Sequence, residues 1–344
     1  YVETMELARC KNKAYAKMSI YEIMLYFLTS PFHHAYMKQT RRELGWDYER
    51  GPKPLAIYGN TKNGKTYLLK YCSRLLTGVN NQVSSYDDGE FSFTKVKDLL
   101  TWSSLFPVIY DDISDTKWGK QYMDQIIRSY WDNWWQGDKN HSQLIVTSNR
   151  RVPQGHLKGR MKEVVMDARF EDSTDNIRHV RSIMNQDNPI FLYFSKRYLE
   201  YMESGIDELF DHTDSMNVGR RVMEDLYKMA DINPPEFFPS CPIEKVVDGN
   251  GLQWLDMINN GDAQWSITSQ KELHITFTTD PEGYEVTRLM DLIPEGLGPS
   301  KIGKKIMIPV PSEFAQWLKY SLPHFEVGWW NRNRNLSKLL KYAE

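Results

Sequence analysis

The segment Gly59–Thr66 carries the residue types that wrap a phosphate group. It fits the pattern GxxxxGK[ST] at every fixed position. Glycines let successive backbone N–H groups turn toward one phosphate, and a helix that begins at the end of the loop adds its positive end. Lys65 would contact the β- and γ-phosphates of a nucleotide, and the Thr66 hydroxyl would ligate Mg²⁺. ATP and Mg²⁺ are the expected cofactors, unless the segment is a plain glycine turn that caps a helix. The predicted nucleotide-binding residues are Gly59, Asn60, Thr61, Lys62, Asn63, Gly64, Lys65 and Thr66.

A pair of carboxylates follows a second apolar run. Residues 106–110 read as a buried strand, and Asp111 and Asp112 come directly after it. A strand end of this kind supplies the carboxylate that a phosphate-binding loop lacks. We expect Asp111 to complete the Mg²⁺ site and Asp112 to polarise an attacking water. In isolation, two adjacent acids would suit a solvated turn equally well.

A third apolar run, Leu144–Val146, ends in the polar residues Thr147, Ser148 and Asn149. In a sheet built around a phosphate-binding loop, this strand should lie beside the other two. Asn149 would then orient the water or contact the γ-phosphate. The sequence therefore predicts that Lys65, Asp112 and Asn149 act together in catalysis.

A parallel sheet must position these residues. Short apolar runs at 54–58, 106–110, 143–146 and 163–166 alternate with helical stretches, which is typical of βαβ units. The predicted fold class is α/β, a parallel sheet flanked by helices. Residues 1–30 have the apolar spacing of a helix, and a polar, basic stretch then leads to a turn at 51–54. His33 and His34 are expected in the loop after that helix, without the partners that a metal site needs.

The rest of the chain is predicted to form further helices and a smaller unit. Helical spacing runs from Phe191 to Met202 and on to about Met229, and prolines between 234 and 242 mark a boundary. Beyond it, strand-like runs at 265–268 and 273–278 flank a turn, and 314–320 looks helical. The predicted organisation is an N-terminal helical segment (1–50), a P-loop ATPase core (51–205), a helical connector (206–242) and a C-terminal α+β module (243–344).

Composition excludes several classes of protein. The 344 residues carry a net charge of -2 and have a mean hydropathy of -0.59. No apolar run approaches the roughly 20 residues that span a bilayer, so no contact with a membrane is expected. The three cysteines lie far apart without metal-ligand spacing, which favours a reducing compartment. The chain opens on Tyr1 without a secretory signal, so we expect an intracellular protein of the cytoplasm or nucleus, and a processed chain or a piece of a longer one.

The three motifs together resemble the compact core of superfamily 3 helicases of small DNA viruses and plasmids, and of AAA+ ATPases more broadly. The resemblance covers residues 55–170. It implies an oligomeric motor, a ring or at least a dimer, that hydrolyses ATP and acts on DNA in replication. In that family an L-x-x-R element supplies an arginine finger to the neighbouring subunit, and Leu157-Lys158-Gly159-Arg160 stands at that position. By resemblance Arg160 inherits the finger role, with Arg150 and Arg151 as alternatives.

Two segments are candidates for contact with DNA. The family carries a basic hairpin between its second and third motifs, and residues 131–141 offer Lys139 and His141 there. The aromatic residues beside them fit a helix face packed on a core. The tail from 300 to 344 holds eight Lys or Arg against three Glu, with Trp317, Trp329 and Trp330 among them. That combination suits either single-stranded DNA or a protein partner.

Two other functions remain open. One is an NTP-gated oligomeric switch of a defence or signalling system, coupled to an effector domain outside this chain. The other is a nucleotide-binding scaffold with little turnover, which Asp112 in place of a Glu favours. Stimulation of hydrolysis by DNA would distinguish the motor from both.

Overall fold

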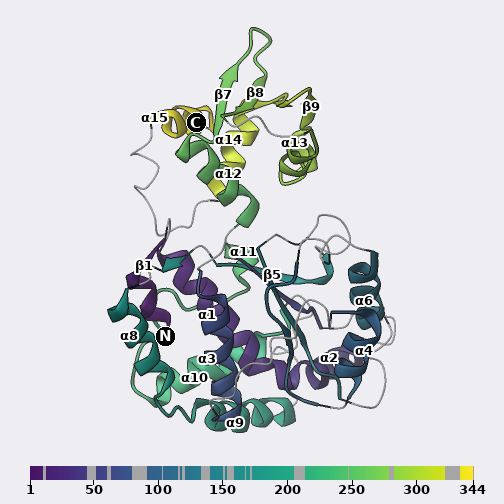
Figure 1. The fold of residues 1–344 in the computed structure, drawn as a ribbon, viewed down its shortest axis with the longest axis vertical. Coiled ribbons are helices and arrows are strands. Elements are labelled where there is room, and N and C mark those ends of the chain that lie inside the picture. The colour runs from purple at the N-terminus through teal and green to yellow at the C-terminus, as the bar shows by residue number, and fades with distance from the viewer. Residues whose placement is uncertain are drawn as a thin grey trace. The chain divides into compact units, whose positions relative to one another are not determined.

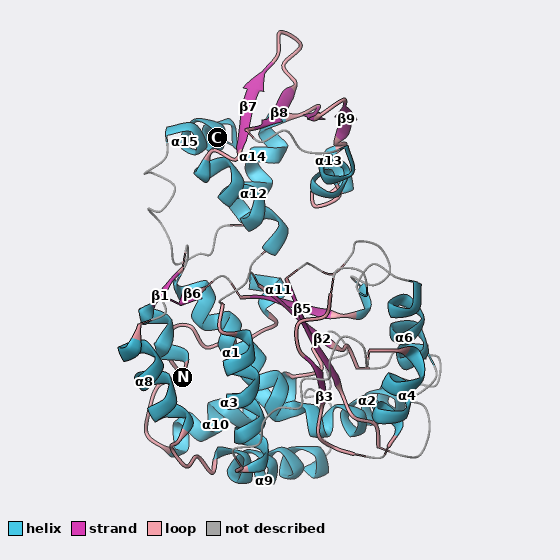
Figure 2. Cartoon of the chain, viewed as in Figure 1, coloured by secondary structure: helices cyan, strands magenta, loops and turns pink. Residues whose placement is uncertain are grey.

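The computed structural model divides into two compact units, Tyr1–Ile243 and Glu244–Glu344 (Figures 1 and 2). In the part of the chain that it describes, no helix is both long and apolar enough to cross a membrane. It describes all residues except 11–12, 45–51, 60–62, 80–90, 103, 115–116, 118–120, 133–139, 150–151, 153–158, 167, 171–172, 205–213, 247, 279–282, 322–333 and 344.

A four-stranded parallel sheet forms the centre of the first unit. The strands lie in the order β3-β4-β2-β5, and all three pairings are parallel. The prediction of a parallel sheet is confirmed, and β4 lies beside both β2 and β3 as expected. The strands are short, and β2 and β3 and most of β4 are apolar because helices cover both faces of the sheet. Strand β5 is half polar, since it begins with Lys162 and Glu163. The strands are β2 (Leu55–Tyr58), β3 (Val108–Tyr110), β4 (Leu144–Ser148) and β5 (Lys162–Val165).

Figure 2 shows helices on the two sides of this sheet. On one side, α4 (Phe93–Thr101) and α6 (Gln121–Asp132) pack against each other over a core that contains Tyr130 and Val146. On the other side, α1 (Lys13–Thr29) contacts both β5 and α3 (Lys65–Thr77). Helix α1 is buried around most of its circumference, which is why its sequence is apolar at nearly every position.

Residues 1–10 differ from the single helix predicted for residues 1–30. A 3₁₀ helix, η1 (Val2–Leu7), leads into a short strand, β1 (Ala8–Arg9). That strand pairs antiparallel with β6 (Arg169–Phe170), and α1 begins only at Lys13. Pairing with a strand more than 150 residues away is a tertiary contact that local spacing does not encode.

The polar, basic stretch that leads to the predicted turn at 51–54 contains a second helix, α2 (His33–Leu44), preceded by a 3₁₀ turn, η2 (Ser30–Phe32). His33 and His34 begin this helix and are buried, so the expectation of a loop there is wrong. Much of the buried face of α2 is polar, since Thr40 is buried as well. The apolar spacing that indicates a helix is therefore absent from the sequence.

Further helices complete the first unit, as the helical spacing up to Met229 predicts. Helix α10 packs against both α9 and α1. At Gly219 of α10, a Cβ atom would lie 2.2 Å from Cγ2 of Thr29, so only glycine permits this close approach of α10 to α1. The helices are α8 (Thr174–Met184), α9 (Ile190–Ser204) and α10 (Asn217–Met229). A short helix, α11 (Ile243–Val246), begins at the last residue of the first unit, and its other residues belong to the second.

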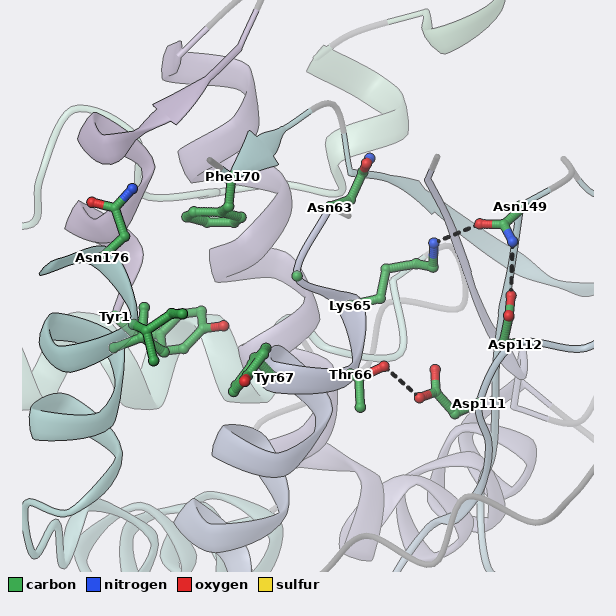
Figure 3. A pocket seen from close by; sticks show the side chains of 13 residues that line it. Tyr1, Asn63, Lys65, Thr66, Tyr67, Asp111, Asp112, Asn149, Phe170 and Asn176 are labelled. Atoms are coloured by element: carbon green, nitrogen blue, oxygen red, sulfur yellow. Dashed lines mark hydrogen bonds between the residues drawn. The ribbon is translucent and has the colours of Figure 1, made fainter. Parts of the chain in front are cut away.

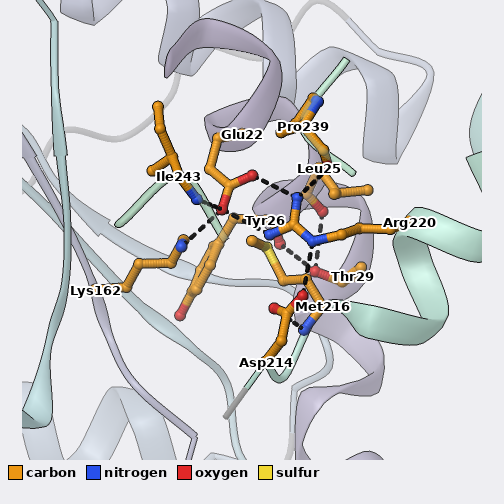
Figure 4. Close-up of polar contacts among 10 residues, drawn as sticks. All are labelled: Glu22, Leu25, Tyr26, Thr29, Lys162, Asp214, Met216, Arg220, Pro239 and Ile243. Atoms are coloured by element: carbon orange, nitrogen blue, oxygen red, sulfur yellow. Dashed lines mark hydrogen bonds and ion pairs between the residues drawn. The ribbon is translucent and has the colours of Figure 1, made fainter. Parts of the chain in front are cut away.

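A buried ionic cluster joins α1, β5 and α10 (Figure 4). The Glu22 carboxylate, which has no exposed surface, accepts hydrogen bonds of 2.7 Å from both terminal nitrogens of Arg220 and pairs with Lys162 Nζ at 2.7 Å. Arg220 also donates to Asp214 at 2.7 Å and to the Pro239 carbonyl at 2.6 Å. Burial alone would raise the pKa of Glu22, but Lys162 and Arg220 outweigh it and lower the pKa below its ordinary value. Glu22 is therefore held as a carboxylate in the interior.

The second unit mixes helices with an antiparallel sheet, as the α+β prediction requires. The sheet order is β7-β8-β10-β9, and Trp254, Phe314 and Leu336 lie in the core. The predicted strands at 265–268 and 273–278 and the helix at 314–320 are confirmed, whereas the β9–β10 hairpin was not predicted. The elements are α12 (Gly249–Asn260), β7 (Ala263–Ile267), β8 (Leu273–Phe277), α13 (Gly283–Met290), η6 (Glu295–Leu297), β9 (Ser300–Ile302), β10 (Lys305–Ile308), α14 (Pro311–Tyr320), α15 (Arg334–Leu340) and η8 (Lys341–Ala343).

Candidate functional site

The phosphate-binding loop joins the carboxyl end of β2 to the amino end of α3, which is the context that the motif requires. Gly64 caps α3 with a φ of +78°, a left-handed conformation that glycine adopts without strain. A Cβ atom at Gly64 would also lie 2.9 Å from the Phe170 ring. The first N–H groups of α3 have no partner within the helix and face the space before it. Asn60, Thr61 and Lys62 lie outside the described residues.

Asn63 braces the end of the loop. Its side chain is buried, and Nδ2 donates a hydrogen bond of 2.5 Å to the carbonyl of Met166, just beyond β5. Asn63 is one of the predicted nucleotide contacts, and the structure shows its side chain directed at the protein instead. Its contact with the strand next to β2 fixes the path of the loop.

Lys65, the first residue of α3, lies between the loop and the end of β4 (Figure 3). Its Nζ donates to the Gly59 carbonyl at 2.5 Å and to Asn149 Oδ1 at 2.9 Å. Burial lowers the pKa of the Lys65 ammonium, and the carboxylates of Asp112 and Asp111 oppose that shift. The ammonium group is thus positioned where a bound phosphate would meet it.

The side chains of Thr66 and Asp111 meet in front of the sheet. Thr66 Oγ1 donates a hydrogen bond of 2.6 Å to Asp111 Oδ2. The other carboxylate oxygen of Asp111 accepts one of 2.6 Å from Thr147 Oγ1 of β4. Asp111 is therefore held from both sides, by the phosphate loop and by the neighbouring strand.

The donor set of Thr66 and Asp111 fits Mg²⁺. The ion prefers oxygen ligands and is usually bound by one or two carboxylates together with substrate phosphates, not by a cage of protein groups. Among the described residues, no three or more His, Cys, Asp or Glu lie together so that they could hold a metal ion. Thr66 and Asp111 are the residues that would hold the ion.

Asp112 adopts an uncommon backbone conformation beside this pair. Its φ is +58°, in the left-handed region that Asp and Asn tolerate better than other side chains. Its carboxylate is exposed, and Asn149 Nδ2 donates to Oδ1 at 2.9 Å. Asn149 thus contacts both Lys65 and Asp112, so the structure brings together three of the four predicted catalytic residues, from beyond the ends of β3 and β4 and from the start of α3. Left-handed conformations of residues other than glycine concentrate at functional sites.

These polar side chains line one end of a pocket of about 400 Å³, a size typical of small-molecule sites. The other end is apolar and aromatic (Figure 3). It is lined by Tyr1, Tyr67 and Phe170, and by Ile177 and Val180 of α8. Sequence reasoning missed this end, because the residues come from distant segments and carry no motif. The arrangement offers phosphates the polar end and a nucleobase the apolar end.

Arg160 lies at the amino ends of the parallel strands, away from the phosphate loop at their carboxyl ends. Strand β5 runs parallel to β2 with Lys162 opposite Leu55, so Arg160 precedes the amino end of β5 while the phosphate loop follows the carboxyl end of β2. Four strand residues span about 13 Å. Arg160 is therefore too distant to serve the pocket of its own chain. One of its terminal nitrogens is buried and has no hydrogen-bond partner within the described part of the chain. Arg150 and Arg151 lie outside the described residues.

The residues expected to contact DNA are only partly described. Lys139, Trp329 and Trp330 lie outside the described residues. His141 is buried, and its ring packs edge to face against another histidine with the centroids 5.1 Å apart, so the expectation that it grips DNA is wrong. Trp317 is partly buried: it donates to the Oδ2 atom of Asp248 at 2.6 Å and packs against the core of the second unit.

Comparison with known proteins agrees with the first unit. A family model described as the Aq_aa27 P-loop NTPase domain matches residues 3–152, less than half of the chain. The matched segment contains Lys65, Asp111, Asp112 and Asn149, and ends before Arg160. Together with the motif and the parallel sheet, the match shows that the fold is that of a P-loop NTPase.

Two further comparisons do not bear on the fold or the activity of this chain. A solved structure titled SCCmec type IV Cch, active helicase, is 11% identical, with 91% of this chain and 72% of that chain covered and a TM-score of 0.36. A TM-score that low supports no conclusion about fold or activity. No curated protein matches the sequence.

Proposed function

We propose that this chain is an oligomeric ATPase, similar to superfamily 3 helicases and AAA+ ATPases, that works on single-stranded DNA, as in replication. The observation that carries the hydrolytic part is the convergence of Lys65, Thr66, Asp111, Asp112 and Asn149 at one end of one pocket. Positioned charges and hydrogen-bond donors are the parts that phosphoryl transfer requires of a protein.

Each residue of the site has a distinct task in the proposed reaction. Lys65 and the N–H groups at the start of α3 bind the β- and γ-phosphates and stabilise their charge. Asp112, free to reach solvent, polarises the attacking water, and Asn149 orients it. When bound, Mg²⁺ would neutralise phosphate charge, held by Thr66 and Asp111. The apolar end, with Tyr67 and Phe170, takes the base.

The second unit supports the DNA-binding part of the proposal. The β9–β10 hairpin exposes Lys301, Lys304 and Lys305 around a tight turn at Gly303. Clustered lysines neutralise backbone phosphates and give binding that depends on salt more than on sequence. We therefore expect phosphate contacts from this hairpin to supply most of the affinity for DNA.

Phosphate release from ATP by the purified chain tests the proposal. Lys65→Ala should abolish hydrolysis and weaken nucleotide binding, because the charge that faces the phosphates is lost. Asp112→Asn should leave binding intact and slow turnover by about 10²–10⁴-fold, since asparagine keeps the shape and tolerates the left-handed conformation but does not polarise water as well. Lys97→Ala, an exposed lysine of α4, is the matched control and should behave as the parent.

The same assay with single-stranded DNA separates the motor from the other functions. DNA should raise the rate, and DNA affinity should fall steeply as salt rises. Hydrolysis at the parental rate by Lys65→Ala would show that the phosphate site is wrongly assigned. Hydrolysis that DNA leaves unchanged would favour the NTP-gated switch, and binding without hydrolysis would favour the scaffold.

A further inference from the structure

Thr147 is a buried polar side chain that contacts the site and to which the proposed reaction assigns no task. It follows Leu144, Ile145 and Val146 on β4, and all four have no exposed surface. The parallel register pairs Tyr110 with Val146, so Asp111 and Thr147 come next on neighbouring strands and share a face of the sheet. A hydroxyl in so apolar a strand needs hydrogen-bond partners.

Both hydrogen-bond partners of the Thr147 hydroxyl lie in the turn after β3, which carries the carboxylates of Asp111 and Asp112. Thr147 Oγ1 donates to Asp111 Oδ1 at 2.6 Å and accepts from the Asp112 N–H at 2.7 Å. The Thr147 carbonyl accepts from the Ile113 N–H at 2.9 Å. One residue of β4 therefore contacts three consecutive residues after β3.

The contact with Asp112 explains how its backbone conformation is maintained. A φ of +58° is unfavourable for a side-chain-bearing residue unless its surroundings fix it. The hydrogen bond from the Asp112 N–H to Thr147 Oγ1 does this, and it turns the Asp112 carboxylate toward Asn149 Nδ2.

The contact with Asp111 fixes the oxygen that faces the metal site. With Oδ1 bound to Thr147, Oδ2 points to Thr66. We propose that Thr147 is a positioning residue: its hydroxyl aligns Asp111 for Mg²⁺ and Asp112 for water at the same time. This inference rests on the proposed hydrolysis.

Thr147→Val removes both side-chain hydrogen bonds and keeps the shape, whereas Thr147→Ser keeps the hydroxyl. We expect Thr147→Val to lower kcat about ten- to a hundredfold, because small misplacements of catalytic groups have effects of that size. The Mg²⁺ concentration for half-maximal rate should rise several-fold. Thr147→Ser should recover most of both losses. Thr40→Val is the matched control, since Thr40 is equally buried but donates only to its own helix, at the Tyr36 carbonyl.

A binding measurement provides a readout that does not depend on activity. Affinity for a fluorescent ATP analogue should be the same for Thr147→Val and the parent in EDTA, and the gain in affinity on adding Mg²⁺ should be smaller in the variant. Equal loss of binding with and without Mg²⁺, or equal loss in Thr147→Ser, would reduce Thr147 to a structural residue and overturn the proposal. Parental kcat and Mg²⁺ dependence in Thr147→Val would overturn it as well. If the parent itself does not hydrolyse ATP, the proposed function fails, and the Mg²⁺-dependent gain in affinity still tests the alignment of Asp111.

Discussion

The side chain of His33 is fully buried at the start of α2 and packs edge to face on Tyr26, with ring centroids 4.8 Å apart. Burial, reinforced by the charge of Lys162, lowers the pKa of His33 to about 3, although the Gln143 side chain opposes the shift. An unfolded histidine has a pKa of about 6.5. Between these values the unfolded chain binds a proton that the folded chain does not, so stability must fall as the pH drops from about 6.5 toward about 3.

His33→Phe should remove this pH dependence. In the parent, the free energy of unfolding in urea should fall by on the order of 1.4 kcal/mol per pH unit below about pH 6.5. The comparison is sharpest above about pH 4.5, where carboxylates still contribute little. The matched control is His179→Phe on the exposed face of α8, which should keep the parental slope. A parental slope in His33→Phe would show that another group titrates.

Residue types and spacing identified Lys65, Thr66 and Asp111 because a phosphate site draws on a short stretch of chain and on strand ends. Sequence reasoning did not identify the residues that hold them. Thr147 contacts Asp111 across two strands, 36 positions apart, and nothing in its local pattern marks it. Likewise, the left-handed backbone conformation of Asp112 could not be predicted, because the position is not occupied by glycine.

At the scale of elements, the cluster around Glu22 joins a helix, a strand and a second helix that are far apart in sequence. Lys162 is the first residue of β5, so its pair with Glu22 fixes where that strand begins against α1. Arg220 fixes α10 to the same carboxylate. One buried charge thus sets the position of β5 and α10 relative to α1.

Glu22→Gln should destabilise the first unit strongly. It leaves two buried cations without the charge that they share, and breaking a buried pair from one side costs about 3–5 kcal/mol. Urea unfolding at pH 7 measures the loss. Glu6→Gln is the control, because Glu6 is exposed and its pairs with Lys13 and Lys17 lie in solvent, so stability should hardly change. Equal losses of unfolding free energy in the two variants would mean that the buried cluster contributes no more to stability than an exposed ion pair.

The pH dependence of this cluster has a definite sign. The folded pKa of Glu22 lies below the unfolded value of about 4.3, so the stabilisation is complete above that value and is lost as the pH falls through the folded pKa. The Glu22→Gln variant should therefore differ most from the parent near neutral pH.

The sequence predicted elements where one face or both faces are uniformly apolar, and missed them elsewhere. Strands β2, β3 and β4 and helix α9 were predicted from such runs, and β5 was predicted from the run at 163–166 although it also contains Lys162 and Glu163. Helix α2 was missed because His33, His34 and Thr40 share its buried face with Tyr36 and Met37. Strand β1 was missed because its two residues depend on pairing with β6.

At the scale of the whole molecule, a residue can contact a nucleotide bound in its own chain only if it lies at the carboxyl ends of the parallel strands. Lys65, Asp111 and Asn149 lie at the carboxyl edge, whereas Arg160 precedes the amino end of β5. An arginine so placed can reach a γ-phosphate only if that phosphate belongs to another copy of the chain. In the proposed oligomer a neighbouring copy would supply that phosphate, and we propose Arg160 as the finger that contacts it.

Mixing two inactive variants tests this assembly. Arg160→Ala lacks the finger and keeps the pocket, and Lys65→Ala lacks the pocket and keeps the finger. If Arg160 acts in trans, mixed oligomers contain interfaces at which an intact pocket meets an intact finger, so ATP hydrolysis should recover in part. The matched control is a mixture of Lys65→Ala with Asp112→Asn, which places both defects in the pocket and should recover nothing through a finger. Recovery measured as phosphate release should rise with protein concentration, because the interface must form first. Mixed oligomers that are confirmed by size and remain inactive would show that Arg160 is not the finger, and Arg150 and Arg151 would be the next arginines to replace.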